Sequence, residues 1–300
     1  MIDLHLHTTA SDGALTPKEL LIKAEKLGLE MIAISDHYTM LGYDDLKDPA
    51  VRDLFSGKIL TACEFGAHYN GSLIEILGYG IDPDEARDYL AETYPPLKEK
   101  MRREMEILIK TYRERGFPFD EQAVRDHFDR EGIAIGARGA IKRELDKYPE
   151  NIARYFNPLS ETDGKSFLRN EVGNPKSPYF LSYDCLFPSA EEICTFIHKM
   201  GGIAIIAHPG AYDQELFNAT EQIILEARPD GLEAWYSTHT EEQREFLLEL
   251  CRKYNLIFSG GSDFHNEQRE ARGNVMGMAP LASVFPVDAI KEWTEPLLKI

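Results

Sequence analysis

Short apolar runs of strand character recur along this chain, and most of them end in a histidine or an acidic residue. The first run, MIDLHLH, is followed by an amphipathic segment that has Pro17 at its start and Gly28 at its end, and then by the apolar run EMIAIS. Proline in the first turn and glycine just past the last turn are typical of an α-helix. This order of strand, helix and strand predicts an α/β fold with a mostly parallel sheet or barrel.

The same alternation is interrupted once. Two more strands, GKILTACEF and SLIEILGYG, are joined by Asn70 and Gly71, a pair that favours a tight hairpin turn. From about residue 82 to 188 the apolar spacing becomes helical. Strands then return as IAIIAH, GLEAWY and LIFSGGSD, which brings the predicted total to seven strands. We therefore predict a core domain over residues 1–81 and 189–300 and a mostly helical insertion over 82–188.

The charge and the apolar segments limit the partners. The chain has 33 Lys and Arg against 51 Asp and Glu, a net charge of −18, which repels duplex nucleic acid but allows a small anion in a local cationic pocket. The apolar run 202–207 is too short to span a bilayer, the first strand starts at Ile2, and the cysteines share no CxxC spacing. These features predict a cytoplasmic protein with reduced thiols and no membrane partner; they do not indicate protein partners.

Imidazoles and carboxylates gather at the ends of the predicted strands. His5 and His7 lie two residues apart, so that both side chains point to the same side of their strand. The other such residues are Asp12, His37, Glu64, His208, Asp263 and His265. So many ionisable groups are costly to bury without compensation, and divalent cations supply it. Mixed nitrogen and oxygen ligands suit Zn, Mn or Fe, and their number implies at least two ions.

The segments DLHLHTTASDG, AISDH, the strand that ends at Glu64, AHP and GSDFH resemble, in this order, the motifs of the polymerase and histidinol phosphatase (PHP) family. This resemblance covers about residues 1–80 and 200–300. It implies a distorted seven-stranded (β/α)7 PHP barrel, with the middle of the chain as the helical, substrate-capping insertion of the stand-alone phosphatase branch. It also implies three metal positions: one with His5, His7, Glu64 and Asp263, one with Glu64 and His208, and one with Asp12, His37 and His265.

The run SLIEILGYG departs from the pattern of this family. Relatives in the branch carry a histidine where this chain has Glu75. A carboxylate there is a harder ligand that favours Mn²⁺ or Fe²⁺ over Zn²⁺, and two or three ions are then expected. Two alternatives stay open: Glu75 is an ion-pair partner within the barrel, or His68 supplies the missing imidazole.

The resemblance implies a phosphoesterase that hydrolyses a small phosphorylated ribose or nucleotide, with a metal-bridging hydroxide as the nucleophile. Glu64 and Asp263 would be catalytic as well as metal ligands. His239, which follows the sixth strand in YSTHT, is our candidate general acid, because a free imidazole titrates near neutral pH. Resemblance further places cations for the substrate at Arg103, Arg138 and Lys176. Residues 139 and 140 depart from the family motif beside Arg138.

Two substrate classes fit this interpretation: a phosphomonoester such as a nucleoside 3′,5′-bisphosphate, and a cyclic phosphodiester of a sugar phosphate. Two other functions compete with it. A C–N bond hydrolase of the amidohydrolase type shares such barrels, but it predicts a bridging lysine at a strand end, where this chain has Glu64. A non-catalytic metal-binding module predicts lost ligands, whereas in this chain only the residue at position 75 is exchanged.

Overall fold

The computed structural model describes residues 1–161, 167–277, 281 and 284–298. These residues form two compact units, each described by itself below. Unit 1 comprises residues 1–69, 73–90 and 188–300, and unit 2 comprises residues 70–72 and 91–187. The predicted insertion began at residue 82, whereas most of the helix α4 (Pro83–Thr93) groups with unit 1. Ion pairs of Arg87 with Asp44 and of Asp84 with Lys47 hold it there.

Unit 1 is built on a seven-stranded sheet whose strands follow the order of the chain. The strands are β1 (Ile2–Leu6), β2 (Met31–Ile34), β3 (Lys58–Tyr69), β4 (Ser72–Tyr79), β5 (Ile203–Ile206), β6 (Gly231–Tyr236) and β7 (Ile257–Gly261). The pairs β1–β2, β2–β3, β5–β6 and β6–β7 are parallel, and β4–β5 is antiparallel. The backbone N–H of His7 donates to the carbonyl of Phe264, just past β7, at 3.0 Å. The sheet is thus nearly closed into a barrel.

The predicted hairpin turn and the predicted ends of the first helix are both confirmed. Asn70 and Gly71 join β3 to β4 with φ of 47° and 79°, the left-handed values that a two-residue hairpin needs. Helix α1 (Pro17–Lys26) begins with Pro17 after the cap Thr16, and Gly28 follows its end with φ of 65°. Local sequence therefore sets these boundaries.

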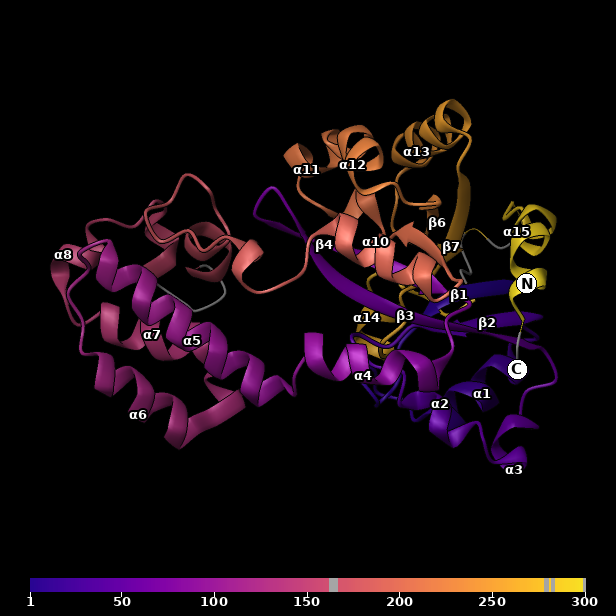
Figure 1. Cartoon of the computed structure of the whole chain (residues 1–300), viewed down its shortest axis with the longest axis horizontal. Coiled ribbons are helices and arrows are strands. Elements are labelled where there is room, and N and C mark those ends of the chain that lie inside the picture. Colours follow the sequence, from indigo (N-terminus) through magenta and orange to yellow (C-terminus); the bar gives the residue numbers. More distant parts are fainter. Residues whose placement is uncertain (162–166, 278–280, 282–283, 299–300) are drawn as a thin grey trace. The chain divides into compact units, whose positions relative to one another are not determined.

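Helices flank the barrel of unit 1 on opposite sides. Figure 1 shows α12 (Thr220–Ala227) and α13 (Glu241–Tyr254) on one side, and α1, α2 (Gly42–Asp45) and α3 (Pro49–Arg52) on the other. The remaining helices of this unit are α10 (Ala190–Lys199), α11 (Gln214–Asn218), α14 (Glu267–Glu270) and α15 (Val287–Thr294). Within the described parts of the chain, every helix is too short or too polar to serve as a membrane span.

The strands of unit 1 divide their side chains between an apolar core and a polar cluster. Ile2 and Leu4 on β1 join a buried core with Leu60 of β3, Leu77 of β4 and Ile205 of β5. The residues of opposite parity on the same strand include Asp3 and His5, which are buried and polar. Because side chains alternate along a strand, one strand can serve both a stabilising core and a functional site.

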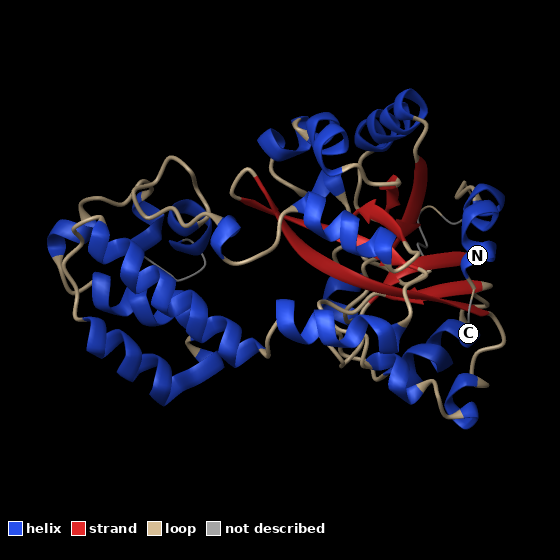
Figure 2. Ribbon diagram, in the orientation of Figure 1, coloured by secondary structure: helices blue, strands red, loops and turns tan. Residues whose placement is uncertain are grey.

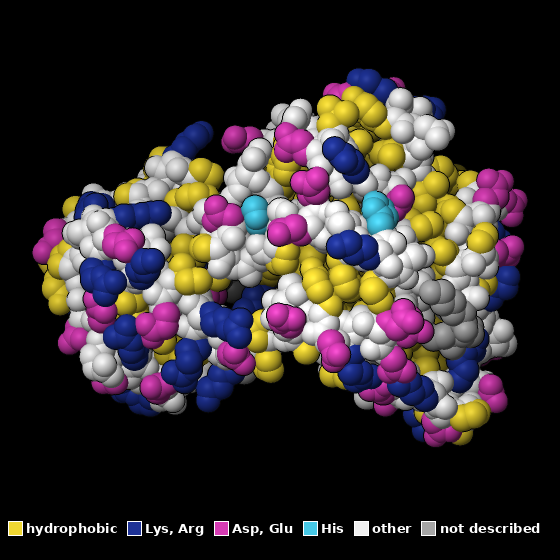
Figure 3. Space-filling model, viewed as in Figure 1, with side chains coloured by type: hydrophobic (Ala, Val, Ile, Leu, Met, Phe, Trp, Pro, Cys, Tyr) yellow, Lys and Arg dark blue, Asp and Glu magenta, His cyan; other side chains and the backbone are white. Residues whose placement is uncertain are grey.

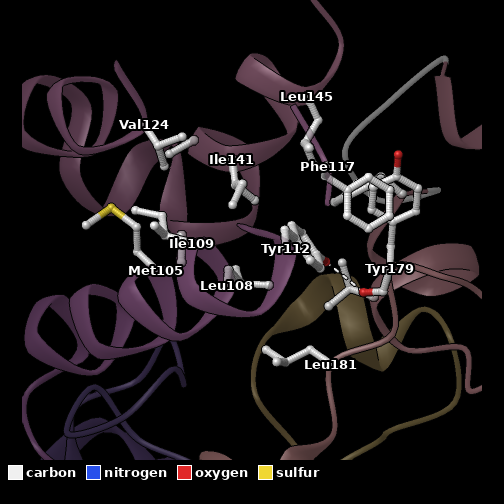
Figure 4. Close-up of a cluster of buried hydrophobic side chains, with 14 of the residues drawn as sticks. Met105, Leu108, Ile109, Tyr112, Phe117, Val124, Ile141, Leu145, Tyr179 and Leu181 are labelled. Carbon is white, nitrogen blue, oxygen red and sulfur yellow. Dashed lines mark hydrogen bonds between the residues drawn. The ribbon is translucent and has the colours of Figure 1, made fainter. Parts of the chain in front are cut away.

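Unit 2 lacks strands over residues 91–187 in its described parts, as the blue and tan ribbons of Figure 2 show. Its helices are α5 (Leu97–Glu114), α6 (Glu121–Glu131), α7 (Gly136–Leu145) and α8 (Pro149–Ile152). Figure 4 shows its own core, in which Leu108, Ile141 and Val124 pack together. The Tyr112 hydroxyl donates to the carbonyl of Tyr179 at 2.7 Å within that core.

Candidate metal centre

Four buried side chains that the sequence singled out converge on one point. The Nε2 atoms of His5 and His7 lie 3.1 Å apart, and the Glu64 Oε2 atom lies 3.2 Å and 3.3 Å from them. Asp263 adds its Oδ1 atom, 3.2 Å from His7 Nε2 and 3.6 Å from His5 Nε2. These four residues come from β1, from β3 and from the end of β7, which the barrel brings together.

A second group shares His7 and adds three residues from loops that follow strands. The Asp12 Oδ1 atom lies 3.0 Å from His265 Nε2, 3.7 Å from His37 Nε2 and 3.8 Å from His7 Nδ1. Asp12 is half exposed, whereas His265 is buried. This group therefore lies at the open edge of the cluster.

Glu64 also connects the cluster to the third set of predicted ligands. Its Oε1 atom lies 3.1 Å from His208 Nε2, which in turn lies 3.4 Å from Glu75 Oε2. His37 Nδ1 lies 3.2 Å from Glu64 Oε2 and 3.8 Å from Glu75 Oε1. His37, Glu64 and Glu75 thus have donor atoms close enough to share one ion. His68, the alternative source of an imidazole, does not belong to any of these groups in the described residues.

Several atoms of the cluster lack hydrogen bonds, which is expected of atoms that bind divalent cations. Several buried ring nitrogens and carboxylate oxygens have no hydrogen-bond partner: His7 Nδ1, His37 Nδ1, Glu64 Oε2, His208 Nδ1 and His265 Nε2. Buried polar atoms in folded proteins nearly always have partners. Two imidazole nitrogens and two carboxylate oxygens at one point are the donor set of Zn²⁺, Mn²⁺ or Fe²⁺. The described residues therefore fit bound metal ions.

The ionisable groups of the cluster have strongly shifted pKa values. Burial opposes protonation of His7 and His208, but hydrogen bonds and charges from the surrounding carboxylates outweigh it and raise the pKa of each to about 9. Burial and the charge of Glu64 raise the pKa of Glu75 to about 7. His37, in contrast, has its pKa lowered to about 4, chiefly by burial. These shifts show how strongly the groups of the cluster interact with one another.

A buried glutamate that the sequence analysis missed holds two of these histidines. Glu233, on β6, accepts from His5 Nδ1 at 3.0 Å and from the backbone N–H of His208 at 2.8 Å. The first bond leaves the Nε2 lone pair of His5 directed at the cluster. An acid inside the otherwise apolar run GLEAWY was the available signal in the sequence.

Asp263 is fixed through the oxygen that does not face the histidines. The Tyr236 hydroxyl donates to its Oδ2 atom at 2.9 Å, and Asn274 Nδ2 donates to the Tyr236 hydroxyl oxygen at 3.1 Å. The Oδ1 atom therefore remains available to the cluster. Both Asp263 and His208 have left-handed backbones, with φ of 53° and 29°, which cost free energy in non-glycine residues.

The structure contradicts the environment that we expected for His239. The predicted acid was a free, exposed imidazole, but the side chain is buried and both ring nitrogens have partners. Its Nε2 atom accepts from the backbone N–H of Gly210 at 3.0 Å, and Nδ1 donates to the carbonyl of Ala234 at 3.2 Å. Burial lowers its pKa to about 4, which disfavours the protonated form that a general acid needs near pH 7.

The predicted substrate-binding cations all lie in unit 2. Arg103 is exposed and pairs with Glu99 on its own helix, and Arg138 pairs with Glu104 and bonds to the Tyr183 hydroxyl. Lys176 is exposed. The face of unit 2 seen in Figure 3 shows cationic and anionic side chains interspersed, as on an ordinary solvated surface. These three residues remain predicted substrate contacts.

A nearly closed barrel with imidazoles and carboxylates gathered at its strand ends defines a metal-dependent hydrolase. Comparison with known proteins is consistent with this class: the model of the PHP domain matches residues 3–156. The chain is also 30% identical over 268 residues to a 5′-3′ exoribonuclease of Haemophilus influenzae, covering 88% of this chain and 89% of the relative. The protein thus belongs to the PHP domain family.

Two further comparisons specify the family resemblance. A 3′,5′-nucleoside bisphosphate phosphatase of Chromobacterium violaceum is 29% identical over 273 residues, covering 88% of this chain and 87% of the relative. A solved structure, described as an amidohydrolase from Chromobacterium violaceum with bound sulfate and no metal, aligns with a TM-score of 0.58 and 26% identity. That alignment covers 89% of this chain and 88% of the other. The chain is an enzyme of the phosphoesterase class, and its PHP barrel fold is confirmed.

Proposed function

We propose that this protein removes a phosphate from a small phosphorylated nucleotide, with a nucleoside 3′,5′-bisphosphate as the first substrate to test. The observation that carries the proposal is the convergence of imidazole and carboxylate atoms around Glu64, several of which have no hydrogen-bond partner. Phosphate ester hydrolysis is among the slowest uncatalysed reactions and demands dense charge stabilisation. The Chromobacterium relative is named for activity on a nucleoside bisphosphate, which supports the substrate class.

The residues that would hold the ions are those of the three groups described above, with Glu64 shared by two of them and Glu75 as a carboxylate ligand. Divalent ions at such a site act as Lewis acids on phosphoryl oxygens and lower the pKa of bound water. We propose two or three ions of Mn, Zn or Fe. The carboxylate at position 75 favours Mn or Fe at its position.

The remaining residues of the cluster orient these ligands. Glu233 holds the ring of His5 and the backbone of His208, and Tyr236 holds Asp263. We propose that Glu64 and Asp263 are catalytic through the ions they bind. The lowered pKa of His239 argues against this residue as the acid, and no other side chain is assigned to protonate the leaving oxygen. We propose that unit 2 acts as the substrate-capping insertion, with Arg103, Arg138 and Lys176 contacting a second anionic group of the substrate.

A substrate panel with controlled metal content tests this function. The purified protein would be stripped with a chelator, reloaded separately with Mn²⁺, Zn²⁺ or Fe²⁺, and assayed for phosphate release. The panel contains a nucleoside 3′,5′-bisphosphate, a 5′-phosphorylated oligoribonucleotide and a cyclic sugar phosphate, followed by product analysis. Metal-dependent release from the bisphosphate is expected. Preference for the oligoribonucleotide or the cyclic phosphate would overturn the substrate, and turnover that survives stripping would overturn the function.

A further inference from the structure

Arg269 places a cation directly against the candidate metal centre. It lies on the short helix α14, which follows the segment that carries Asp263 and His265. Its Nη1 atom lies 3.3 Å from Asp263 Oδ2, and its Nη2 atom lies 3.9 Å from Asp12 Oδ2. Among the described residues, Arg269 is the arginine or lysine that forms ion pairs with the side chains of this cluster. Its side chain is 39% exposed, so that the guanidinium lies at the open edge.

The groups around Arg269 have better partners of their own. Asp263 Oδ2 accepts from the Tyr236 hydroxyl at 2.9 Å, which is shorter than its contact with the guanidinium. The Nδ1 atom of His265 lies 2.9 Å from the carbonyl of Asp263, to which it donates. Arg269 Nη1 lies 3.0 Å from this nitrogen. Because both nitrogens then carry hydrogens to donate, they do not form a hydrogen bond with each other. The known contacts leave most of the five guanidinium donors unused.

These observations point to an anion at the edge of the cluster. A guanidinium keeps its charge at all accessible pH values and binds two oxygens of a phosphate with parallel hydrogen bonds. Bound cations would share the charge of Asp12 and Asp263, which weakens their hold on Arg269. We propose that Arg269 is a catalytic residue that binds a non-bridging oxygen of the phosphoryl group under attack. This inference rests on the proposed function, since it assigns a further residue to the same site.

The test measures phosphate binding without turnover. Inorganic phosphate would be titrated calorimetrically into the metal-reloaded protein and into its Arg269→Gln and Arg269→Lys variants, with metal content measured for each. Arg272→Gln, a change at an exposed arginine three residues later, is the matched control. We expect Arg269→Gln to weaken phosphate binding by about tenfold or more, the loss of a charge-assisted hydrogen bond, with unchanged metal content. Arg269→Lys should keep part of the affinity, because it keeps the charge without the fork.

The outcomes separate this inference from the proposed function. Unchanged phosphate affinity in Arg269→Gln would overturn it, as would the absence of phosphate binding by the unaltered protein. Loss of metal ions from Arg269→Gln would also overturn it, because the residue would then act by holding Asp263. Failure of the nucleotide panel with a phosphate affinity that still depends on Arg269 would reject the proposed substrate and leave this assignment in place.

Discussion

Two fully buried glutamates, Glu171 in unit 2 and Glu64 in unit 1, lie in opposite environments. Glu171 in unit 2 accepts from the backbone N–H groups of Phe156 and Asn157 and from the hydroxyls of Ser160 and Ser177. Glu64 in unit 1 has an Oε2 atom without a hydrogen-bond partner, although it is equally buried. A buried carboxylate with four donors is a structural element. One whose Oε2 atom faces three imidazole nitrogens at 3.2–3.3 Å without a hydrogen bond is a site suited to a ligand.

The largest expected effect comes from Glu64→Gln. The amide keeps the shape but removes the charge that all three ligand groups use or adjoin, so that metal content should fall and phosphate release should drop by about a thousandfold or more. Metal analysis and the phosphate assay measure both. Glu249→Gln, at an exposed position of α13, is the control and should match the unaltered protein. Full metal content with normal turnover in Glu64→Gln would remove the distinction between the two glutamates.

Glu171→Gln should do the reverse. Its amide nitrogen would face donors that the carboxylate now satisfies, which should lower the free energy of unfolding by about 2–3 kcal/mol. Urea unfolding monitored by the tyrosines of unit 2 measures this loss, and metal content should stay constant. The exposed Glu114→Gln in the same unit is the control. A stable Glu171→Gln protein that has lost its metal ions would contradict the assignment of this residue to folding alone.

Glu233→Gln tests a carboxylate that combines features of the other two. Like Glu171 it accepts hydrogen bonds, but its donors belong to two of the candidate metal ligands. Glutamine offers one acceptor oxygen where the His5 ring and the His208 backbone both donate. We expect metal affinity to fall by about 10- to 100-fold, the usual effect of losing such a supporting partner. Competition with a metal-binding dye measures it, with the exposed Glu241→Gln as control. An unchanged affinity would mean that the strand geometry alone positions His5.

The smallest expected effect concerns the thiols. Burial raises the pKa of Cys194 and Cys251 to about 12, and burial together with the charges of Asp36 and Glu64 raises that of Cys63 well above its usual range. Cys185 of unit 2 is exposed. At pH 8 a thiol reagent should therefore label only Cys185 in the folded protein, as mass spectrometry of peptides can determine. Labelling of Cys63 after metal removal would show that the ions, rather than the fold, close the barrel around Glu64.

The sequence predicted most of the barrel and where its ionisable residues gather, because both depend on local patterns. The residues two apart on a strand, the hairpin at Asn70 and Gly71, and the polar ends of apolar runs each follow from backbone geometry. The supporting shell could not be predicted in the same way. Glu233 contacts His5 across 228 positions of sequence, a distance over which no local pattern carries information.

The unexpected burial of His239 has the same origin. A loop position before a helix usually indicates exposure, but the close approach of Gly210 buries this ring. A Cβ atom on that glycine would lie 2.7 Å from His239 Cδ2. Whether an imidazole is a proton donor or a buried acceptor depends on such tertiary contacts, and these appear only when distant segments are assembled.

The left-handed backbones of His208 and Asp263 have a consequence for attempts to raise the thermal stability of this protein. Glycine at either position would relieve the torsional penalty, so that a screen for heat resistance alone would tend to collect such replacements. Each would also delete a side chain of the cluster. Laboratory evolution of this protein should therefore select for turnover and thermal stability together, because one route to a more stable chain removes side chains of the candidate metal centre.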